Sequence, residues 1–377
     1  MGAGLGGNYM SRGDSRRVRL GTWLGTASLL AGSLTLGVGS VSAQAAAKPF
    51  KACVVTDTGG INDKSFNASA YKGMEDAHAR NKNIVVSYLS SQSSADYVPN
   101  INSFVHQGCG IIVTVGFLMD TATQQAANAH PHQKFAIVDD APQHLKYHNV
   151  LALQYETDQA AFLGGYLAAA STHTGVVGTY GGMEFPSVTM YMNGFVAGVR
   201  YYDKVKGAAV KVLGWTPAKG SCSLASCGGT GTFVGNFTDQ TAGKTIAAND
   251  FAAGADIVFP VAGSVGLGSV VAAQQAGRGH SIMWVDSNGC VSDAADCSWF
   301  IGTVAKGVEA SVRDAVLAAA SGKFHGGTYL GTLKNQGTAL EYGGIPVPAA
   351  IKKAIAAIAK GIESGRISVN PNNYPVK

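Results

Sequence analysis

Residues 51–75 read KACVVTDTGGINDKSFNASAYKGME, and the type of fold follows from this stretch. Residues 52–56 form an apolar run rich in β-branched side chains, which is typical of a strand buried on both faces in a parallel sheet. A glycine-rich turn at 57–60 comes next, and a helical pattern runs through 68–80. A strand, a glycine turn and a helix in this order predict the first unit of an open α/β sheet, in which ligands bind beyond the carboxyl ends of the strands.

Four side chains of this stretch stand where such a ligand binds: Asp57, Lys64, Phe66 and Asn67. They offer an acceptor, a cation, an aromatic face and an amide. Each kind also has a purely structural interpretation, because an Asp after a strand often stabilises a turn or a helix cap. A Phe at the start of a helix often packs into the core. The stretch alone leaves both interpretations open.

Short apolar runs continue to alternate with helical patterns along the chain. We expect further strands at residues 84–89, 111–115, 135–138, 150–153, 174–180, 210–213, 256–261 and 281–285. This alternation predicts a parallel α/β protein. The pattern restarts near residue 174, and 377 residues are too many for one ordinary core, so we expect two lobes joined by a hinge.

Residues 1–45 are predicted to be a secretory signal peptide. Four arginines lie between residues 12 and 19, residues 20–41 are apolar and rich in small side chains, and a small-x-small cleavage site follows. An uncleaved anchor is the alternative, because the apolar part is marginally long enough to span a membrane. The segment carries four Arg and one Asp, so about +2 of the formal net charge of +5 remains. That charge gives no case for nucleic-acid binding.

An even number of cysteines in an exported chain predicts disulfides. The six are Cys53, Cys109, Cys222, Cys227, Cys290 and Cys297. Sequence alone permits 15 connectivities. The local pairs Cys222–Cys227 and Cys290–Cys297 are favoured by proximity, and Cys53–Cys109 is plausible because each begins an apolar strand and those strands are neighbours in a doubly wound sheet. A zinc site is disfavoured, since the spacing supplies no further ligands.

The candidate catalytic motifs in the sequence are incomplete. The sequence AGKT at 242–245 lacks the first glycine of a phosphate loop, because Thr238 stands there. Residues 262–266 resemble a nucleophile elbow but begin with Ala262. His130 and His132 form an isolated pair without the further ligands of a metal site. We therefore expect neither an enzyme, nor a cofactor, nor a metal.

Polar or aromatic residues recur where strands end. They are Asp57, Phe117, Asp139, Phe237, Gly263 and Asp286. Several carboxylates facing one cleft suit a ligand with many hydroxyl groups, because a carboxylate accepts from two neighbouring hydroxyls at once. Phenylalanine rings provide flat faces for a planar ring. A sugar joined to a planar base satisfies both demands.

Residues 50–345 resemble the basic membrane protein (BMP) family of substrate-binding proteins, the purine nucleoside receptor group of ABC importers. The most specific match is D-x-G-G-x-x-D-K-S-F-N at 57–67. Further matches lie at 135–140, 162–168, 193–198, 254–259, 284–286 and 303–306. The resemblance implies a type I periplasmic-binding-protein fold, with two doubly wound parallel-sheet lobes that close on a nucleoside. Lobe 1 is then expected at 48–165 with a return at about 287–320, and lobe 2 at 166–286 with a C-terminal part at 321–377.

The resemblance also implies a role for each strand-end residue. On the base side, Phe66 stacks on the ring, Phe237 forms the opposite face and Phe117 lies nearby. Asp57 and Asn67 read or orient the base.

On the sugar side, Asp286 takes the ribose hydroxyls, and Lys306 pairs with Asp286 and reaches the sugar. Gly263 lets the backbone approach the ligand, and Asp139 is a further acceptor.

One departure from the family concerns the membrane anchor. Members often carry a lipidated Cys after the signal, whereas Cys53 follows Phe-Lys-Ala, which is no lipobox. We therefore expect a monomer free in the periplasm or outside the cell that delivers a purine nucleoside to an ABC permease. The alternatives are an exported nucleoside-processing hydrolase, for which Asp139 and Asp140 are the only support, and a ligand-sensing receptor of the same fold.

Overall fold

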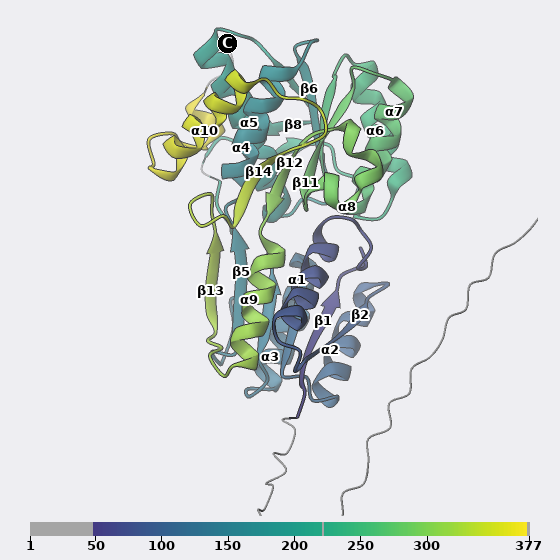
Figure 1. Cartoon of the computed structure of the whole chain (residues 1–377), viewed down its shortest axis with the longest axis vertical. Coiled ribbons are helices and arrows are strands. Elements are labelled where there is room, and N and C mark those ends of the chain that lie inside the picture. The colour runs from purple at the N-terminus through teal and green to yellow at the C-terminus, as the bar shows by residue number, and fades with distance from the viewer. Residues whose placement is uncertain (1–47, 221, 375–377) are drawn as a thin grey trace, which may run out of the picture. The chain divides into compact units, whose positions relative to one another are not determined.

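Two six-stranded sheets carry the part of the chain that the computed structural model describes, residues 48–220 and 222–374 (Figure 1). The predicted signal peptide at 1–45 lies outside these residues. The first sheet has the order β13-β5-β4-β3-β1-β2, and the second has the order β14-β12-β11-β10-β6-β7. The order β3-β1-β2 is that of a doubly wound sheet.

All strands of the first sheet are parallel. They are β1 (Phe50–Thr56), β2 (Ile84–Ser90), β3 (Ile111–Val115), β4 (Phe135–Val138), β5 (Val150–Tyr155) and β13 (Gly327–Gly331). Helices cover both faces: α1 (Phe66–Arg80) and α9 (Val308–Ala320) on one, α2 (Tyr97–His106) and α3 (Asp120–Ala129) on the other. Val54 packs with the first pair of helices and Val55 with the second. This burial on both faces is why residues 52–56 lack an alternating pattern.

The second sheet is parallel except for its last strand, which runs antiparallel to β12. Its strands are β6 (Val176–Gly181), β7 (Lys211–Leu213), β10 (Ile257–Val261), β11 (Ser281–Asp286), β12 (Phe300–Lys306) and β14 (Thr338–Tyr342). The helices α4 (Thr157–Ser171), α5 (Pro186–Lys206) and α10 (Ala349–Glu363) pack on one face, and α6 (Gln240–Ala252) and α7 (Gly266–Ala276) on the other. A short ribbon, β8 (Trp215–Pro217) with β9 (Gly229–Gly231), and the one-turn helix α8 (Gly289–Ser292) complete this lobe.

The chain passes between the sheets at other places than the sequence predicts. The helix α4 packs against α5 in lobe 2, so lobe 1 ends with β5 rather than at residue 165. The strand β12 belongs to the second sheet, and only α9 and β13 return to the first. The prediction that the chain returns to lobe 1 over residues 287–320 was therefore wrong at both ends. The return begins after β12, and it continues beyond residue 320 to β13. Periodicity identifies a strand or a helix, but it carries no information on which of two similar sheets the element joins.

Three disulfides join the six cysteines in the predicted pairs, Cys53–Cys109, Cys222–Cys227 and Cys290–Cys297. The first links β1 to the segment before β3, the neighbouring strand, and its Cα atoms are 6.0 Å apart. Within the described residues, none of the helices has both the length and the apolar content needed to cross a membrane.

Gly165 is expected to be essential for the packing of α4 on α5. A Cβ atom at this position overlaps the backbone carbonyl of Phe195, which cannot move as a flexible side chain can. Gly165→Ala should therefore lower the free energy of unfolding by about 1–3 kcal/mol, the usual cost of overpacking. Urea unfolding followed by circular dichroism measures it, with Gly228→Ala as the control because the space around Gly228 is open. Equal midpoints for the two variants contradict the prediction.

Candidate functional site

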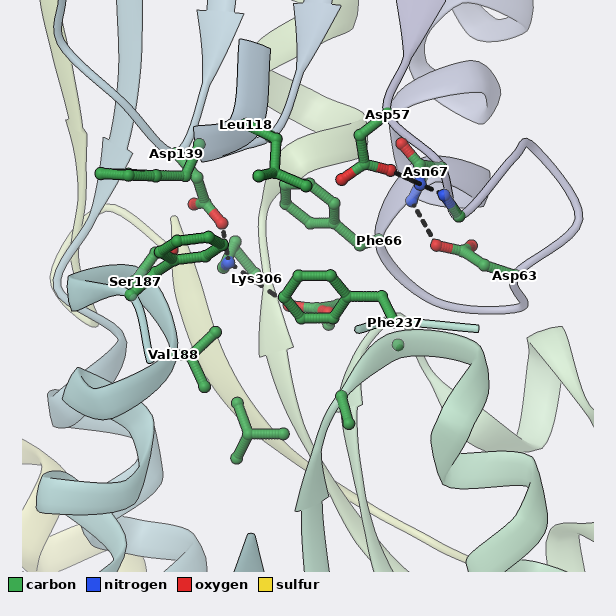
Figure 2. A pocket seen from close by; sticks show the side chains of 18 of the residues that line it. Asp57, Asp63, Phe66, Asn67, Leu118, Asp139, Ser187, Val188, Phe237 and Lys306 are labelled. Carbon is green, nitrogen blue, oxygen red and sulfur yellow. Dashed lines mark hydrogen bonds and ion pairs between the residues drawn. The ribbon is translucent and has the colours of Figure 1, made fainter. Parts of the chain in front are cut away.

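One cavity lies at the carboxyl ends of both sheets, and all nine residues singled out from the sequence line it (Figure 2). Lobe 1 contributes Asp57, Phe66, Asn67, Phe117 and Asp139, and lobe 2 contributes Phe237, Gly263, Asp286 and Lys306. The empty space is about 560 Å³, part of it open to solvent. That these nine residues contact a ligand stays a prediction.

The turn after β1 and the start of α1 form the hydrogen-bonding end of the cavity. Asp57 Oδ1 accepts from the Gly59 backbone N–H at 3.0 Å and from Asn67 Nδ2 at 2.8 Å. Burial raises the pKa of Asp57, while the Asn67 amide and the Gly59 N–H lower it in part. Asn67 Oδ1 is buried and has no hydrogen-bond partner among the described residues. Both interpretations of Asp57 therefore hold, since one carboxylate stabilises the turn and also faces the cavity.

Aromatic rings occupy the middle of the cavity. Figure 2 shows Phe66 and Phe237 in the centre, between the Asp57 end and the Asp139 end. Phe66 begins α1. The sequence predicts Phe237 at the end of a strand, but this residue lies in the loop between β9 and α6. A second pair, Phe117 and Phe185, stacks across the two lobes with ring centroids 4.7 Å apart.

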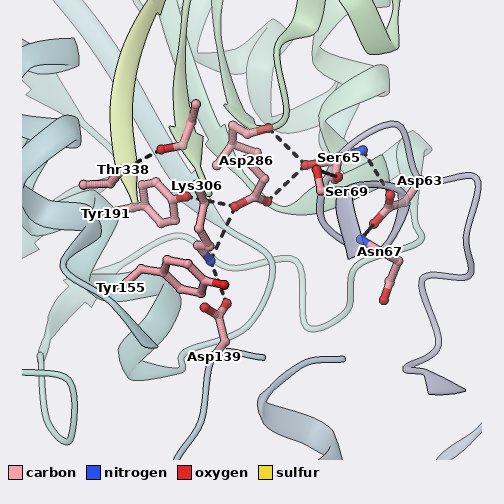
Figure 3. A network of polar contacts seen from close by, with 12 residues as sticks. Asp63, Ser65, Asn67, Ser69, Asp139, Tyr155, Tyr191, Asp286, Lys306 and Thr338 are labelled. Atoms are coloured by element: carbon pink, nitrogen blue, oxygen red, sulfur yellow. Dashed lines mark hydrogen bonds and ion pairs between the residues drawn. The ribbon is translucent and has the colours of Figure 1, made fainter. Parts of the chain in front are cut away.

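A buried cation between two carboxylates forms the other end of the cavity (Figure 3). Lys306 Nζ lies 2.6 Å from Asp139 Oδ2 and 3.4 Å from Asp286 Oδ1. The Lys306 side chain is only 3% exposed. Asp286 also accepts from the Tyr191 hydroxyl at 2.8 Å and from the Ser65 hydroxyl at 3.0 Å. Every charge in this cluster is therefore paired, as burial requires.

The charge of Lys306 is maintained by its surroundings. Burial alone lowers the pKa of the Lys306 ammonium, but the attraction of Asp139 and Asp286 outweighs burial and the net shift is upward. Nζ also lies 4.8 Å from the centre of the Phe66 ring, within cation–π range. Both aspartates have a positive φ, 70° for Asp139 and 64° for Asp286. Such backbone conformations are costly outside glycine and concentrate at functional sites.

The sequence of the chain matches a known family over most of its length. Residues 50–226 and 231–336 match the model of the Bmp family, described as PnrA-like ABC transporter substrate-binding protein. All nine predicted cavity residues fall inside these two ranges. The chain belongs to the Bmp family. Members are solute-binding proteins, which agrees with the expectation that the chain is not an enzyme.

Relatives of this Bmp-family chain are known from sequence and from structure. The ABC transporter nucleoside-binding protein BmpA of Lactococcus lactis subsp. cremoris (strain MG1363) is 31% identical over 335 residues, which are 85% of this chain and 88% of that protein. The crystal structure of an ABC transporter solute-binding protein from Aeropyrum pernix K1 aligns with a TM-score of 0.68 and 26% sequence identity, over 86% of this chain and 83% of that one. The fold is therefore the type I periplasmic-binding-protein fold expected from the sequence.

Bmp-family proteins act outside the cytoplasm, and some of them are named lipoproteins. One is an uncharacterized lipoprotein of Pyrococcus abyssi, 26% identical over 85% of this chain and 76% of that protein. The expectation that this chain lacks a lipid anchor thus stays a prediction. Across the described residues, no group of three or more His, Cys, Asp or Glu side chains is arranged to hold a metal ion.

Asp63, Phe185 and Tyr191 are among the cavity-lining residues that the sequence does not single out. Asp63 accepts from the backbone N–H groups of Ser65, Asn67 and Ala68 and so caps α1. An Asp just before a helical pattern is a common capping residue, so the sequence indicates this role. Phe185 directly precedes the proline that begins α5, soon after β6, and an aromatic residue at that position was a usable signal. Tyr191 sits within a helix, where no sequence pattern distinguishes it from a core residue.

Lys64, in contrast, does not line the cavity. Its Nζ lies 2.5 Å from Asp293 Oδ1, and its backbone carbonyl accepts from the Ser287 hydroxyl at 2.8 Å. Asp293 and Ser287 follow β11 in lobe 2, so Lys64 joins the two lobes beside the cavity. The Lys64 side chain is 45% exposed, whereas the Asp293 side chain is only 4% exposed, so solvent reaches this ion pair from the lysine side alone.

Proposed function

We propose that this Bmp-family protein captures a purine nucleoside between its two lobes and delivers it to an ABC importer. The observation that carries the proposal is the order of groups along the cavity. A hydrogen-bonding end, a pair of aromatic rings and a buried Lys–Asp–Asp cluster follow one another (Figure 2). A nucleoside has the same order: the polar edge of a base, its flat faces, and a sugar. The Lactococcus lactis relative is named as a nucleoside-binding protein, which supports this choice.

The base would lie between Phe66 and Phe237. A base offers a π-face to each ring, and stacking of this kind is worth about 1–3 kcal/mol per base. Its polar edge would then meet Asp57 and Asn67. Asn67 Oδ1 has no partner among the described residues and accepts a hydrogen bond, so it suits a donor on the base.

The ribose would lie over Lys306. An ionised carboxylate has about four acceptor positions, and Asp286 uses three of them, for Lys306, Tyr191 and Ser65. The remaining position accepts a ribose hydroxyl. Asp139 Oδ2 takes the ammonium of Lys306, which leaves Oδ1 as a second acceptor for the sugar.

Capture would proceed by closure of the lobes. Asp139 belongs to lobe 1 and Lys306 to lobe 2, so their ion pair forms only when the lobes are together. The Ser65–Asp286 and Lys64–Asp293 contacts also join the lobes. A ligand that contacts both walls prefers the closed state and shifts the population toward it. The permease would then recognise the closed, loaded monomer.

Calorimetry with inosine, hypoxanthine and ribose tests the proposal. We expect binding of one inosine per chain, weaker binding of hypoxanthine and little binding of ribose. Chromatography of the same samples should show unchanged inosine. Release of ribose instead favours the alternative of an exported hydrolase, which the paired Asp139 and Asp140 suggest. Binding of none of these ligands contradicts the specificity but not the fold.

Asp286→Ala should weaken nucleoside binding more than binding of the free base. The variant removes an acceptor for the ribose hydroxyls, and a hydrogen bond to a charged group is worth about 1.5–3 kcal/mol. We expect roughly a 10- to 150-fold loss of affinity for inosine and a smaller loss for hypoxanthine. Titration calorimetry with both ligands measures the ratio. Equal losses exclude the ribose role of Asp286.

A further inference from the structure

A second, smaller chamber continues the nucleoside cavity beyond the charge cluster. The two spaces share Asp139 and Ser187 as lining residues. The empty space of the chamber is about 260 Å³, including the part open to solvent. The space that the centre of a water molecule can reach is only about 10 Å³, about the room that one water needs, so the chamber suits one small group of a ligand. In Figure 2, Asp139 and Ser187 lie at the end of the cavity opposite Asp57 and Asn67.

Thr157 gives this chamber an unused polar group. The residue is 2% exposed, and its hydroxyl is buried without a hydrogen-bond partner in the described part of the chain. Leaving such a group unsatisfied destabilises the ligand-free protein. Asp139 is the only charged residue among the described residues that line the chamber, and one of its carboxylate oxygens already accepts from Lys306. The Thr157 hydroxyl therefore has the properties of a ligand contact and not of a packing residue.

Two helices begin at the chamber. Thr157 is the first residue of α4, and Ser187 is the second residue of α5. The first N–H groups of a helix have no partner within the helix, and the positive end of the helix dipole lies there. The chamber thus combines the Thr157 hydroxyl and the positive ends of two helix dipoles with an acceptor from Asp139. A hydroxyl group, which both donates and accepts, satisfies this combination, whereas the Asp139 carboxylate repels a phosphate.

A disulfide-closed loop limits the depth of the chamber. Leu224 lines the chamber and lies between Cys222 and Cys227, which are joined. Cys227 Sγ accepts from Asn193 Nδ2 at 2.8 Å, and Asn193 is part of α5. The loop is therefore attached to the helix that forms one wall. Because the Leu224 side chain is apolar, it offers no hydrogen bond to a longer, charged substituent that reaches this end of the chamber.

We propose that the chamber receives the exocyclic hydroxymethyl group of the sugar and that Thr157 is its hydrogen-bonding partner. The inference rests on the proposed function. With the base between the two Phe rings and the ribose diol on Asp286, the hydroxymethyl is the remaining polar group of the sugar, and it is attached at C4′, across the ring oxygen from the carbon that carries the base. Thr157, Asp139 and Leu224 then select unphosphorylated nucleosides.

Affinities of the wild type and of Thr157→Val for three ligands test this inference. Inosine, 5′-deoxyinosine and inosine 5′-monophosphate differ only at the group that enters the chamber. In the wild type we expect 5′-deoxyinosine to bind roughly tenfold more weakly than inosine, the value of one hydrogen bond, and the monophosphate to bind more weakly still. Thr157→Val should lower affinity for inosine by a similar factor and leave 5′-deoxyinosine unchanged. Thr241→Val, at an exposed position of α6, is the matched control.

Urea unfolding of the ligand-free protein separates a binding role from a structural one. Removing an unpartnered buried hydroxyl should leave the stability equal to or above that of the wild type. A marked loss of stability, equal binding of inosine by both forms, or tighter binding of the monophosphate each overturns the inference while the proposed function stands. Failure of the wild type to bind inosine overturns the proposed function and this inference together.

Discussion

Lys306→Met is expected to lower the free energy of unfolding by about 3–5 kcal/mol and to abolish nucleoside binding. The substitution keeps most of the side-chain volume but leaves Asp139 and Asp286 buried without a cation, and breaking a buried ion pair from one side has this cost. Asp139 is 10% exposed and Asp286 is 8% exposed, so water cannot replace the ammonium. Urea unfolding followed by circular dichroism gives the free energy, and calorimetry gives the affinity.

Two further variants sharpen the test of Lys306. Lys64→Met removes a second lysine–aspartate pair between the lobes, in which the lysine is 45% exposed and the aspartate 4% exposed. It should cost less than Lys306→Met, because it leaves one buried carboxylate without a cation rather than two. Asp139→Asn in the Lys306→Met background removes one of the unpaired carboxylates and should restore part of the lost stability. A Lys306→Met protein as stable as Lys64→Met, or a double variant less stable than Lys306→Met, contradicts the role assigned to the cluster.

Phe66→Ala should weaken nucleoside binding by about 5- to 150-fold while the protein stays folded. The ring gives one of the two flat faces for the base, and base–aromatic stacking is worth about 1–3 kcal/mol. The same ring lies 4.8 Å from Lys306 Nζ, so the variant also removes a contact that positions the ammonium. Calorimetry with inosine measures the change in affinity.

The control for Phe66 is Tyr88→Ala. Tyr88 is a large aromatic residue that is 47% exposed on β2 and does not line the cavity. The Tyr88→Ala protein should bind inosine with the same affinity as the wild type. Phe237→Ala should reproduce the loss, because that ring is the opposite face in the proposed arrangement. Wild-type affinity in both Phe variants excludes a base between these rings.

Much of the binding cavity can be read from the sequence because its residues stand at chain positions that the fold makes special. Asp57, Asp139 and Asp286 each come at the carboxyl end of a parallel strand, and those ends meet in the interlobe space. Phe237 lines the same cavity although it belongs to a loop and not to a strand end, where the sequence predicts it. Lys306 has the sequence surroundings of a solvated lysine, yet it is 3% exposed.

Sequence alone determines the alternation of strands and helices and the motif at 57–67, and it favours the three disulfide pairs that the structure contains. Each depends on local periodicity, on turn chemistry or on cysteines that lie in neighbouring strands or a few residues apart. Tertiary structure alone decides which sheet receives β12 and β13, which carboxylates pair with Lys306, and that Thr157 faces a chamber. Lys306 and Asp139 are 167 residues apart and belong to different lobes, so their pairing depends on where the chain crosses between the sheets. Local patterns carry no record of those crossings, because a strand has the same periodicity in either sheet.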